Sequence, residues 1–305
     1  MDLTLEAVAC LDSQQLRVLL PQWLTGFLEV SEELKQRSST AVEAALERFD
    51  DAQLQVSLKR LLSVGNEYRL YRADPLATAL TRAFMDVLSE GSALTGLERL
   101  KLARTEGPVL LISNHLAYCD TQLKDTLFAN AGADDVASSM IVVAGPKVYE
   151  TAFRRMASLG LSTLKTAQSA VLSHNDAELS AREVASIAVE TVHVAHEQMK
   201  AGGLVLLYGE GSRSRTRQLQ PFIKAIRKYA SLPGCQVVPM AISGSQEMMP
   251  LNQTQMYATP VTLQIGKPVV VDDVGRSEAI ALAWEQIANM LPEVHRPEPS
   301  TPPVI

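Results

Sequence analysis

The segment GPVLLISNHLAYCD, residues 107–120, marks a change in the pattern of the chain. Before it, apolar residues recur at the three- and four-residue spacing of amphipathic helices. From Pro108 onward, short apolar runs alternate with longer helical patterns, which is typical of an α/β domain with a largely parallel sheet. The segment itself starts as an apolar strand and ends in a polar cluster that contains Asn114, His115 and Asp120.

The second part of the chain, residues 105–291, is expected to form an α/β domain. Its fold class is a mixed, largely parallel central sheet flanked by helices. Strands are expected at 108–113, 138–144, 161–165, 203–208, 236–242 and 261–265. Helices are expected at about 119–130, 147–158, 177–200, 221–230 and 276–291.

The first part, residues 1–104, is expected to be an N-terminal helical bundle domain. A first helix contains Pro21 as a kink or break, two more cover about 31–49 and 52–64, and Asp74-Pro75 opens another that ends near Gly91. The last fourteen residues, 292–305, are rich in proline and are expected to be disordered.

The composition narrows the classes of function. The chain has 305 residues, 47% of them apolar, and a formal net charge of -6, so nucleic acid is not an expected partner. Its three cysteines are scattered, which favours reduced thiols in a cytosolic protein. We see neither a signal peptide nor an apolar run near the length needed to span a bilayer. A cytoplasmic protein is expected, with at most peripheral contact at the inner face of a membrane.

His115 and Asp120 form the first candidate site. Within one helix, residues five apart point about 140° away from each other. They can meet if His115 lies in the strand-to-helix turn and Asp120 reaches back from the first helical turn, which leaves the other imidazole nitrogen as a base. Two alternatives stay open: Asn114 as a helix N-cap beside an incidental histidine, and a Cys119–His115 nucleophile pair, which the adjacent carboxylate disfavours.

The second candidate site is LVLLYGEGSRSRTR, residues 204–217, where a strand delivers a glycine-rich turn and arginines at alternate positions. Glycines let backbone N–H groups approach an anion, and guanidinium groups suit a phosphate. A dinucleotide fingerprint is an alternative, although the third small residue is Ser214 and the strand comes late in the region. A P-loop is excluded because its motif does not occur, and the basic residues 224–228 favour a solvated face.

Together, N-H-x-x-x-x-D at 114–120 and E-G-x-R-x-R at 210–215 resemble the glycerolipid acyltransferase family, which includes glycerol-3-phosphate and lysophosphatidic acid acyltransferases. Two weaker blocks occur in the right order, one with Lys147, Gly160 and Lys165, the other with Pro239 after a strand. The resemblance covers about residues 105–270. Gly209 stands where many members have proline, and Lys165 where arginine is usual. A chain without spanning helices and with a helical N-terminal domain looks more like the plastid glycerol-3-phosphate acyltransferases.

The resemblance implies transfer of a fatty acyl group from a thioester to a hydroxyl of a glycerol phosphate, in phospholipid synthesis. It implies His115 as general base oriented by Asp120, and Arg213 and Arg215, with Lys165, as ligands of the acceptor's phosphate. Backbone N–H groups near Gly211 are implied as oxyanion donors. Asn114 and Glu210 are implied to position the acceptor.

The resemblance leaves the partners partly open. The donor is an acyl carrier protein or a coenzyme A thioester, and the acceptor is a glycerol phosphate or a lysophospholipid. No cofactor or metal is expected, and His193 and His196 match no zinc motif. Two other functions remain: a non-catalytic phospholipid-binding protein, and a thioesterase or other hydrolase in which water replaces the acceptor.

Overall fold

The computed structural model describes residues 4–168 and 179–304, which fall into two compact units. Unit 1 combines residues 1–90, 142–191 and 254–258, and unit 2 combines 91–141, 192–253 and 259–305. The expected boundary near residue 104 is therefore not where the chain divides, because residues 142–191 group with the N-terminal helices. Two elements run from one unit into the other, β4 (Met140–Ala144) and α10 (Ala181–Lys200).

Unit 1 is mainly helical. Its helices are α1 (Leu5–Ala9), α2 (Ser13–Thr25), α3 (Glu32–Leu46), α4 (Asp51–Ser63), α5 (Pro75–Leu88), η1 (Pro146–Tyr149) and α9 (Ala152–Leu159). Its short strands β1 (Leu70–Tyr71) and β5 (Ser162–Lys165) pair antiparallel. A kink or a break was expected at Pro21, and the helix α2 continues through this residue without a break.

Asp74 anchors unit 1 at the start of α5, where the Asp-Pro pair predicted a helix N-terminus. Its carboxylate caps Leu76 and Ala77 and also accepts bonds from Ser57 (2.7 Å) and Arg60 (2.8 Å) of α4. The side chain is almost fully buried, so these donors satisfy a charge that would otherwise be costly. The prediction of a helix opened by Asp74-Pro75 is confirmed.

Unit 2 contains the α/β part of the fold. Its strands are β2 (Ala93–Thr95), β3 (Val109–Ser113), β6 (Leu204–Tyr208), β7 (Gln236–Ser243), β8 (Thr262–Ile265) and β9 (Val269–Val270). Strand β3 is parallel to both β6 and β7, β8 is antiparallel to β7 and parallel to β2, and β9 is antiparallel to β7. The mixed, largely parallel α/β arrangement is confirmed.

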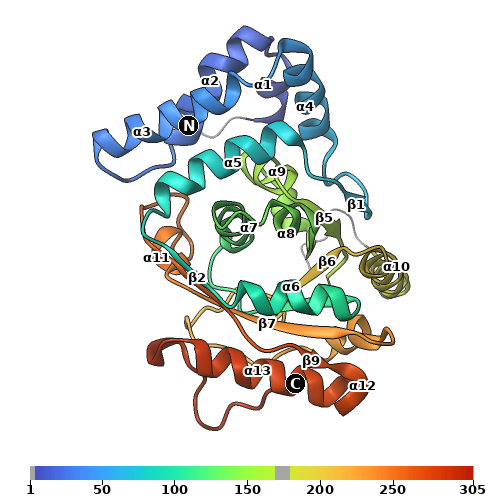
Figure 1. The fold of residues 1–305 in the computed structure, drawn as a ribbon. Coiled ribbons are helices and arrows are strands. Elements are labelled where there is room, and N and C mark those ends of the chain that lie inside the picture. The colour runs from blue at the N-terminus through green and yellow to red at the C-terminus, as the bar shows by residue number, and fades with distance from the viewer. Residues whose placement is uncertain (1–3, 169–178, 305) are drawn as a thin grey trace. The chain divides into compact units, whose positions relative to one another are not determined.

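Helices flank these strands. They are α6 (Leu97–Glu106), α7 (Asp120–Asn130), α8 (Asp134–Ser139), α11 (Ser245–Met248), α12 (Val271–Val274) and α13 (Arg276–Met290), with 3₁₀ turns η3 (Lys224–Ser231) and η4 (Glu293–His295). Figure 1 shows α6 and α13 on opposite sides of β7. The buried β3, with both neighbours parallel to it, explains why 109–113 reads as a continuous apolar run.

The C-terminal tail packs on unit 2, so the expectation of disorder is wrong for residues 292–304. The Leu219 N–H donates to the His295 carbonyl at 2.9 Å, the Phe222 N–H donates to the Pro303 carbonyl at 2.9 Å, and Phe222 forms a parallel bridge with Val304. Proline-rich composition predicted disorder because it lowers local helix and strand propensity. These long-range backbone bonds to residues 219–222 order the tail instead.

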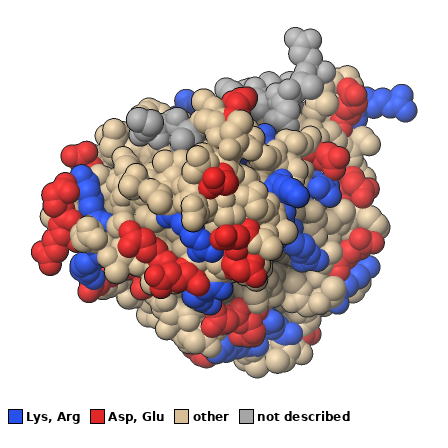
Figure 2. Space-filling model, turned by 90° about the horizontal axis from the view of Figure 1, so that it is seen from above, with Lys and Arg blue, Asp and Glu red and all other residues tan. Residues whose placement is uncertain are grey.

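Lys, Arg, Asp and Glu side chains are interspersed over the face shown in Figure 2. Within the described residues, no helix is long and apolar enough to cross a bilayer.

Candidate active site

The site begins where β3 ends, at the carboxyl end of a strand with parallel neighbours on both sides, where open α/β sheets build ligand sites. Asn114 follows the strand and exchanges two hydrogen bonds of 2.9 Å with the backbone N–H and carbonyl of Ile242. Its amide therefore ties the end of β3 to β7 and fixes the backbone from which His115 projects. Asn114 does not cap a helix, because α7 starts only at Asp120, with Cys119 at the N-cap position.

His115 and Asp120 meet as the spacing predicted. The imidazole Nδ1 lies 2.8 Å from Asp120 Oδ2, and the same oxygen accepts the N–H groups of Leu116 (2.7 Å) and Ala117 (3.1 Å). Three donors on one carboxylate oxygen fix the position of the imidazole. The His115 side chain keeps 17% of its surface exposed while Asp120 is fully buried. Nδ1 is thus engaged, and Nε2 is the nitrogen left for a substrate.

The protonation states of this pair follow from burial and charge. Burial lowers the pKa of His115, and the bond and charge of Asp120 counteract this only in part, so the pKa stays below its ordinary value. Burial alone would raise the pKa of Asp120, but the bond from His115 and the charge of Lys124 outweigh it and lower the pKa. An ionised Asp120 beside a neutral His115 is the arrangement of a general base and its orienting partner.

The ring of His115 also has an aromatic neighbour. Tyr208, the last residue of β6, stacks on it with ring centroids 3.9 Å apart and an angle of 19°. The register of the parallel pair places Tyr208 beside Ser113, two residues before His115. Its hydroxyl lies 2.7 Å from that of Thr121. The stack and the carboxylate together restrict the imidazole to one orientation.

The turn after β6 folds back onto His115. Gly209 N–H donates to the Ser113 carbonyl at 3.1 Å, and Ser214 N–H donates to the His115 carbonyl at 2.8 Å. A Cβ on Gly209 would lie 2.4 Å from the Phe222 ring. Proline does not fit at position 209, because it has no N–H to bond to Ser113 and because its ring would collide with that of Phe222. This explains why glycine stands here, where many members of the family that the sequence resembles have proline.

Glu210 is a buried acid at the base of this turn. Its Oε1 accepts the His115 N–H at 3.3 Å, and among the described residues its Oε2 has no hydrogen-bond partner. Burial raises the pKa of Glu210 to about 9. At neutral pH the side chain is therefore a neutral carboxylic acid, which can donate a hydrogen bond as well as accept one.

Gly211 adopts a φ of 72°, which glycine tolerates best, and its N–H donates to the Tyr208 carbonyl at 3.0 Å. The turn therefore uses the N–H of Gly211 itself, and the role of N–H groups near Gly211 as oxyanion donors stays a prediction. Within the described chain, the backbone N–H groups of Ser212 and Arg213 donate to no acceptor. They are two backbone donors left open beside Gly211.

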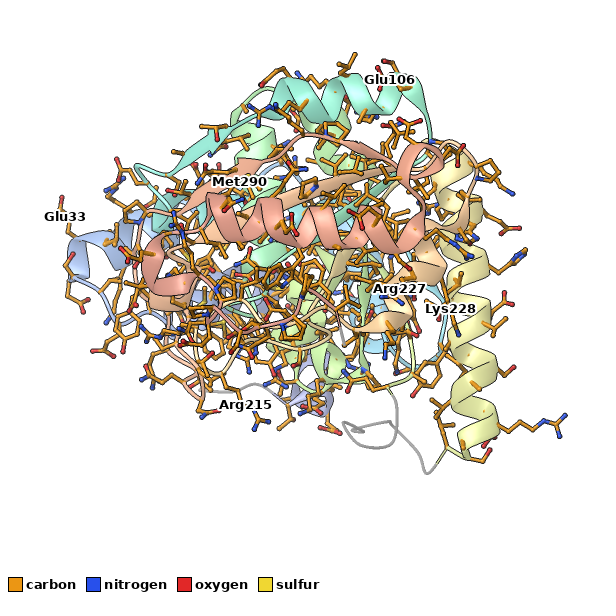
Figure 3. The ribbon with its side chains drawn as sticks, turned by 90° about the horizontal axis from the view of Figure 1, so that it is seen from below. Glu33, Glu106, Arg215, Arg227, Lys228 and Met290 are labelled. Carbon is orange, nitrogen blue, oxygen red and sulfur yellow. The ribbon has the colours of Figure 1, made fainter. Side chains whose placement is uncertain are left out.

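The three arginines of the turn have different surroundings. Arg213 is half-buried, its guanidinium lies 3.6 Å from the centre of the Tyr118 ring, and its charge lowers the pKa of His115. Arg215 is exposed and lies apart from Arg227 and Lys228, which follow each other on η3 (Figure 3). Arg217 pairs with Glu247 at 2.6 Å. Arg213 is thus the guanidinium that the structure ties to the His115 segment.

Lys165 lies on β5 in unit 1 and is almost completely buried. Its ammonium donates to the Gly65 carbonyl and lies 4.6 Å from the Tyr68 ring centre and 5.4 Å from that of Tyr149. These contacts describe a cation held by a carbonyl and two aromatic faces. A role in binding phosphate stays a prediction.

The surroundings of Cys119 disfavour a role as a nucleophile activated by His115. Its side chain is buried, and burial together with the Asp120 charge raises the pKa of the thiol far above its ordinary value. The reactive form of a cysteine is the thiolate, which this environment disfavours.

Three residues of the site were not anticipated from the sequence: Tyr118, Tyr208 and Lys124. Lys124 lies one helical turn after Asp120 and is fully buried beside Tyr208. Tyr118 lies inside the N-H-x-x-x-x-D block and Tyr208 directly precedes Gly209, so adjacency to the two blocks was the available signal. A lysine in a helical pattern is normally exposed to solvent, so the sequence contained no indication that Lys124 is buried.

Comparison with known proteins identifies a protein family that matches part of this chain. Residues 93–243 match the family model described as Acyltransferase. This match supports the glycerolipid acyltransferase family that the two sequence blocks resemble. The match includes both sequence blocks of the site, from His115 to the arginine turn.

Two individual similarities accompany this match. A 1-acyl-sn-glycerol-3-phosphate acyltransferase from Cocos nucifera is 29% identical over 89 residues, which is 29% of this chain and 29% of that protein. The chain thus aligns with less than a third of the length of this curated relative. The crystal structure of the 1-acyl-sn-glycerophosphate (LPA) acyltransferase PlsC from Thermotoga maritima aligns with 90% of this chain and 98% of its own, at 16% identity and a TM-score of 0.48.

Proposed function

We propose that this protein transfers a fatty acyl group from an acyl thioester to a hydroxyl of glycerol 3-phosphate or 1-acylglycerol 3-phosphate. The observation that carries the proposal is the His115–Asp120 pair, with Nδ1 bound at 2.8 Å and Nε2 left for a substrate. The match of residues 93–243 to the acyltransferase family model supports the reaction class. The activity of the Cocos nucifera relative supports the acylated acceptor, while the resemblance to plastid enzymes favours the unacylated one.

The reaction needs no nucleophile from the protein. The acceptor hydroxyl gives its proton to His115 Nε2 as its oxygen bonds to the thioester carbonyl carbon, and the carbonyl oxygen becomes an oxyanion. The intermediate then collapses, the carbon–sulfur bond breaks, and the proton on Nε2 passes to the leaving thiolate. Asp120 stays ionised throughout and stabilises the imidazolium that forms between these steps.

The turn at 209–217 supplies the remaining parts in this proposal. The open N–H groups of Ser212 and Arg213 stabilise the oxyanion. Arg213 binds the acceptor's phosphate in this proposal. Its positive charge is close enough to His115 to lower the pKa of that imidazole, so a phosphate bound there lies near the base. The neutral Glu210 keeps its proton and orients the acceptor by donating a hydrogen bond to it. Arg215 and Lys165 remain further candidates for the phosphate.

The donor is an acyl carrier protein or coenzyme A thioester, and one grid of reactions tests the whole proposal. Palmitoyl thioesters of both carriers are incubated with glycerol 3-phosphate, 1-acylglycerol 3-phosphate and lysophosphatidylcholine, and the release of thiol and the formation of ester are measured. Ester formation with a glycerol phosphate acceptor is expected. Free fatty acid released without any acceptor would instead indicate a hydrolase, and binding without turnover would indicate a lipid-binding protein.

A further inference from the structure

Lys124 is a buried cation that the acyl-transfer mechanism above does not use. It lies on α7 one turn after Asp120 and is 0% exposed. Its ammonium approaches the Asp120 carbonyl at 3.5 Å and the Tyr208 hydroxyl at 3.4 Å, both at the long limit of a hydrogen bond. It forms no ion pair with any described residue. A buried ammonium with such weak partners is costly, and an apolar side chain of the same length would avoid the cost.

Both groups that Lys124 approaches belong to residues that touch the imidazole of His115. Asp120 binds His115 Nδ1 at 2.8 Å, and Tyr208 stacks on the His115 ring at 3.9 Å. The ammonium also lies 4.9 Å from the centre of that same Tyr208 ring. Lys124 therefore contacts the two neighbours that orient the imidazole without contacting the imidazole itself.

We propose that Lys124 is a positioning residue whose buried positive charge keeps His115 in its neutral, proton-accepting form and Asp120 ionised. The proposal rests on the general-base role of His115 and extends it. A cation near a histidine disfavours the imidazolium, and the same cation near a carboxylate favours the anion. Both directions occur here, since the charge of Lys124 lowers the pKa of His115 and lowers that of Asp120.

Other ionisable groups around the pair are accounted for. Arg213 lowers the pKa of His115 as Lys124 does, and Glu210 is neutral at its raised pKa of about 9. The pKa values of Cys119 and Tyr208 are raised by burial and by the Asp120 charge, so both stay protonated at neutral pH. Among the described residues, the charges of Lys124 and Arg213 lower the pKa of His115, and the charge of Lys124 also lowers that of Asp120.

The sign of the effect defines a pH window. A histidine whose pKa is lowered keeps its neutral form down to a lower pH, so the charge of Lys124 protects the base against acid. Burial lowers the pKa of Lys124 itself to about 8. Between the pKa of His115 and about pH 8, Lys124 is charged and His115 is neutral, and in this window the site is ready to accept a proton.

Titration of His115 followed by NMR tests the proposal without any assay of turnover. Ring-labelled histidine is incorporated into the full chain, and the His115 signal is assigned by its loss in His115→Gln. In Lys124→Met we expect the His115 midpoint to move to higher pH than in the wild type. Lys101→Met, an exposed lysine of α6, is the matched control and should leave the midpoint in place. An unchanged midpoint in folded Lys124→Met would overturn the proposal.

A second measurement covers the case in which Lys124→Met does not fold. In the wild type, the His115 signal should show a second inflection near pH 8 as Lys124 loses its proton. A His115 signal that stays flat through this range would contradict the proposal.

The acyl-transfer assay separates this proposal from the proposed function. Relative to wild type, kcat/KM of Lys124→Met should fall about three- to tenfold more at pH 6 than at pH 8, because more of His115 is protonated. An equal loss at both pH values would mean that Lys124 only supports packing. A wild type without turnover would refute the acyltransferase, while the NMR titration would still decide the effect of Lys124.

Discussion

At the scale of single residues, the site depends on which groups are charged at neutral pH. His115 is neutral and Asp120 ionised, while the raised pKa of Glu210, about 9, keeps that acid protonated. Two carboxyl groups that accept hydrogen bonds from His115, one from its ring and one from its backbone, thus have opposite protonation states. Asp120 receives three hydrogen bonds on one oxygen, whereas Glu210 receives one long bond and is desolvated. In the proposed mechanism, this difference in donors gives Asp120 the role of orienting His115 and Glu210 the role of a hydrogen-bond donor.

Glu210→Gln should be tolerated and should change how stability depends on pH. The ordinary pKa of 4.5 is raised to about 9 by burial, so the folded protein holds a proton that the unfolded chain releases. This group therefore makes the wild type less stable as pH rises from about 4.5 to about 9. Urea unfolding should show Glu210→Gln gaining on the order of 1–4 kcal/mol over wild type between pH 5 and pH 8. Parallel pH profiles for the two proteins would contradict a buried neutral Glu210.

Arg213→Ala should raise the apparent KM for the phosphate acceptor by about tenfold or more, because a charge-assisted bond is lost. The KM for the thioester should change much less in steady-state kinetics. Arg217→Ala is the matched control, since Arg217 is engaged by Glu247. Equal increases in both KM values for Arg213→Ala would move this arginine out of the phosphate site.

At the scale of elements, the arginine turn is held from both sides. Its first residues bond to the end of β3, and its last residues bond to the C-terminal tail. His295 is the buried link between tail and turn, with Nδ1 2.9 Å from the Arg217 carbonyl and Nε2 3.0 Å from the amide nitrogen of Gln246. The tail therefore belongs to the structure that supports the site.

His295→Ala should destabilise unit 2 through this link. Removing the ring leaves the Gln246 amide without its partner, which should cost about 1–3 kcal/mol in the free energy of unfolding. Urea denaturation measures this loss. The acceptor KM should rise at the same time, because the end of the arginine turn is released. A variant with wild-type stability and wild-type KM would show that the tail does not support the turn.

At the scale of the whole molecule, local pattern predicted the elements better than their grouping. The six expected strands appear as β3 to β8, and His115, Asp120 and the turn at 209–217 were placed by motif and spacing. The features that the local sequence pattern could not predict depend on pairing between segments far apart in the sequence. Tyr208 reaches His115 through the β3–β6 register, and Phe222 orders a proline-rich tail. The grouping of 142–191 with the N-terminal helices likewise depends on packing that no local signal encodes.

Replacing His115 alone tests whether its imidazole is the general base of the reaction. Acyl transfer to a glycerol phosphate is measured for His115→Ala beside His193→Ala, an exposed histidine on α10 that pairs with Glu197. We predict wild-type turnover for His193→Ala and a loss of at least about 100-fold in kcat for His115→Ala, with an unchanged circular dichroism spectrum. Normal turnover by folded His115→Ala would contradict the central claim that this imidazole takes the proton.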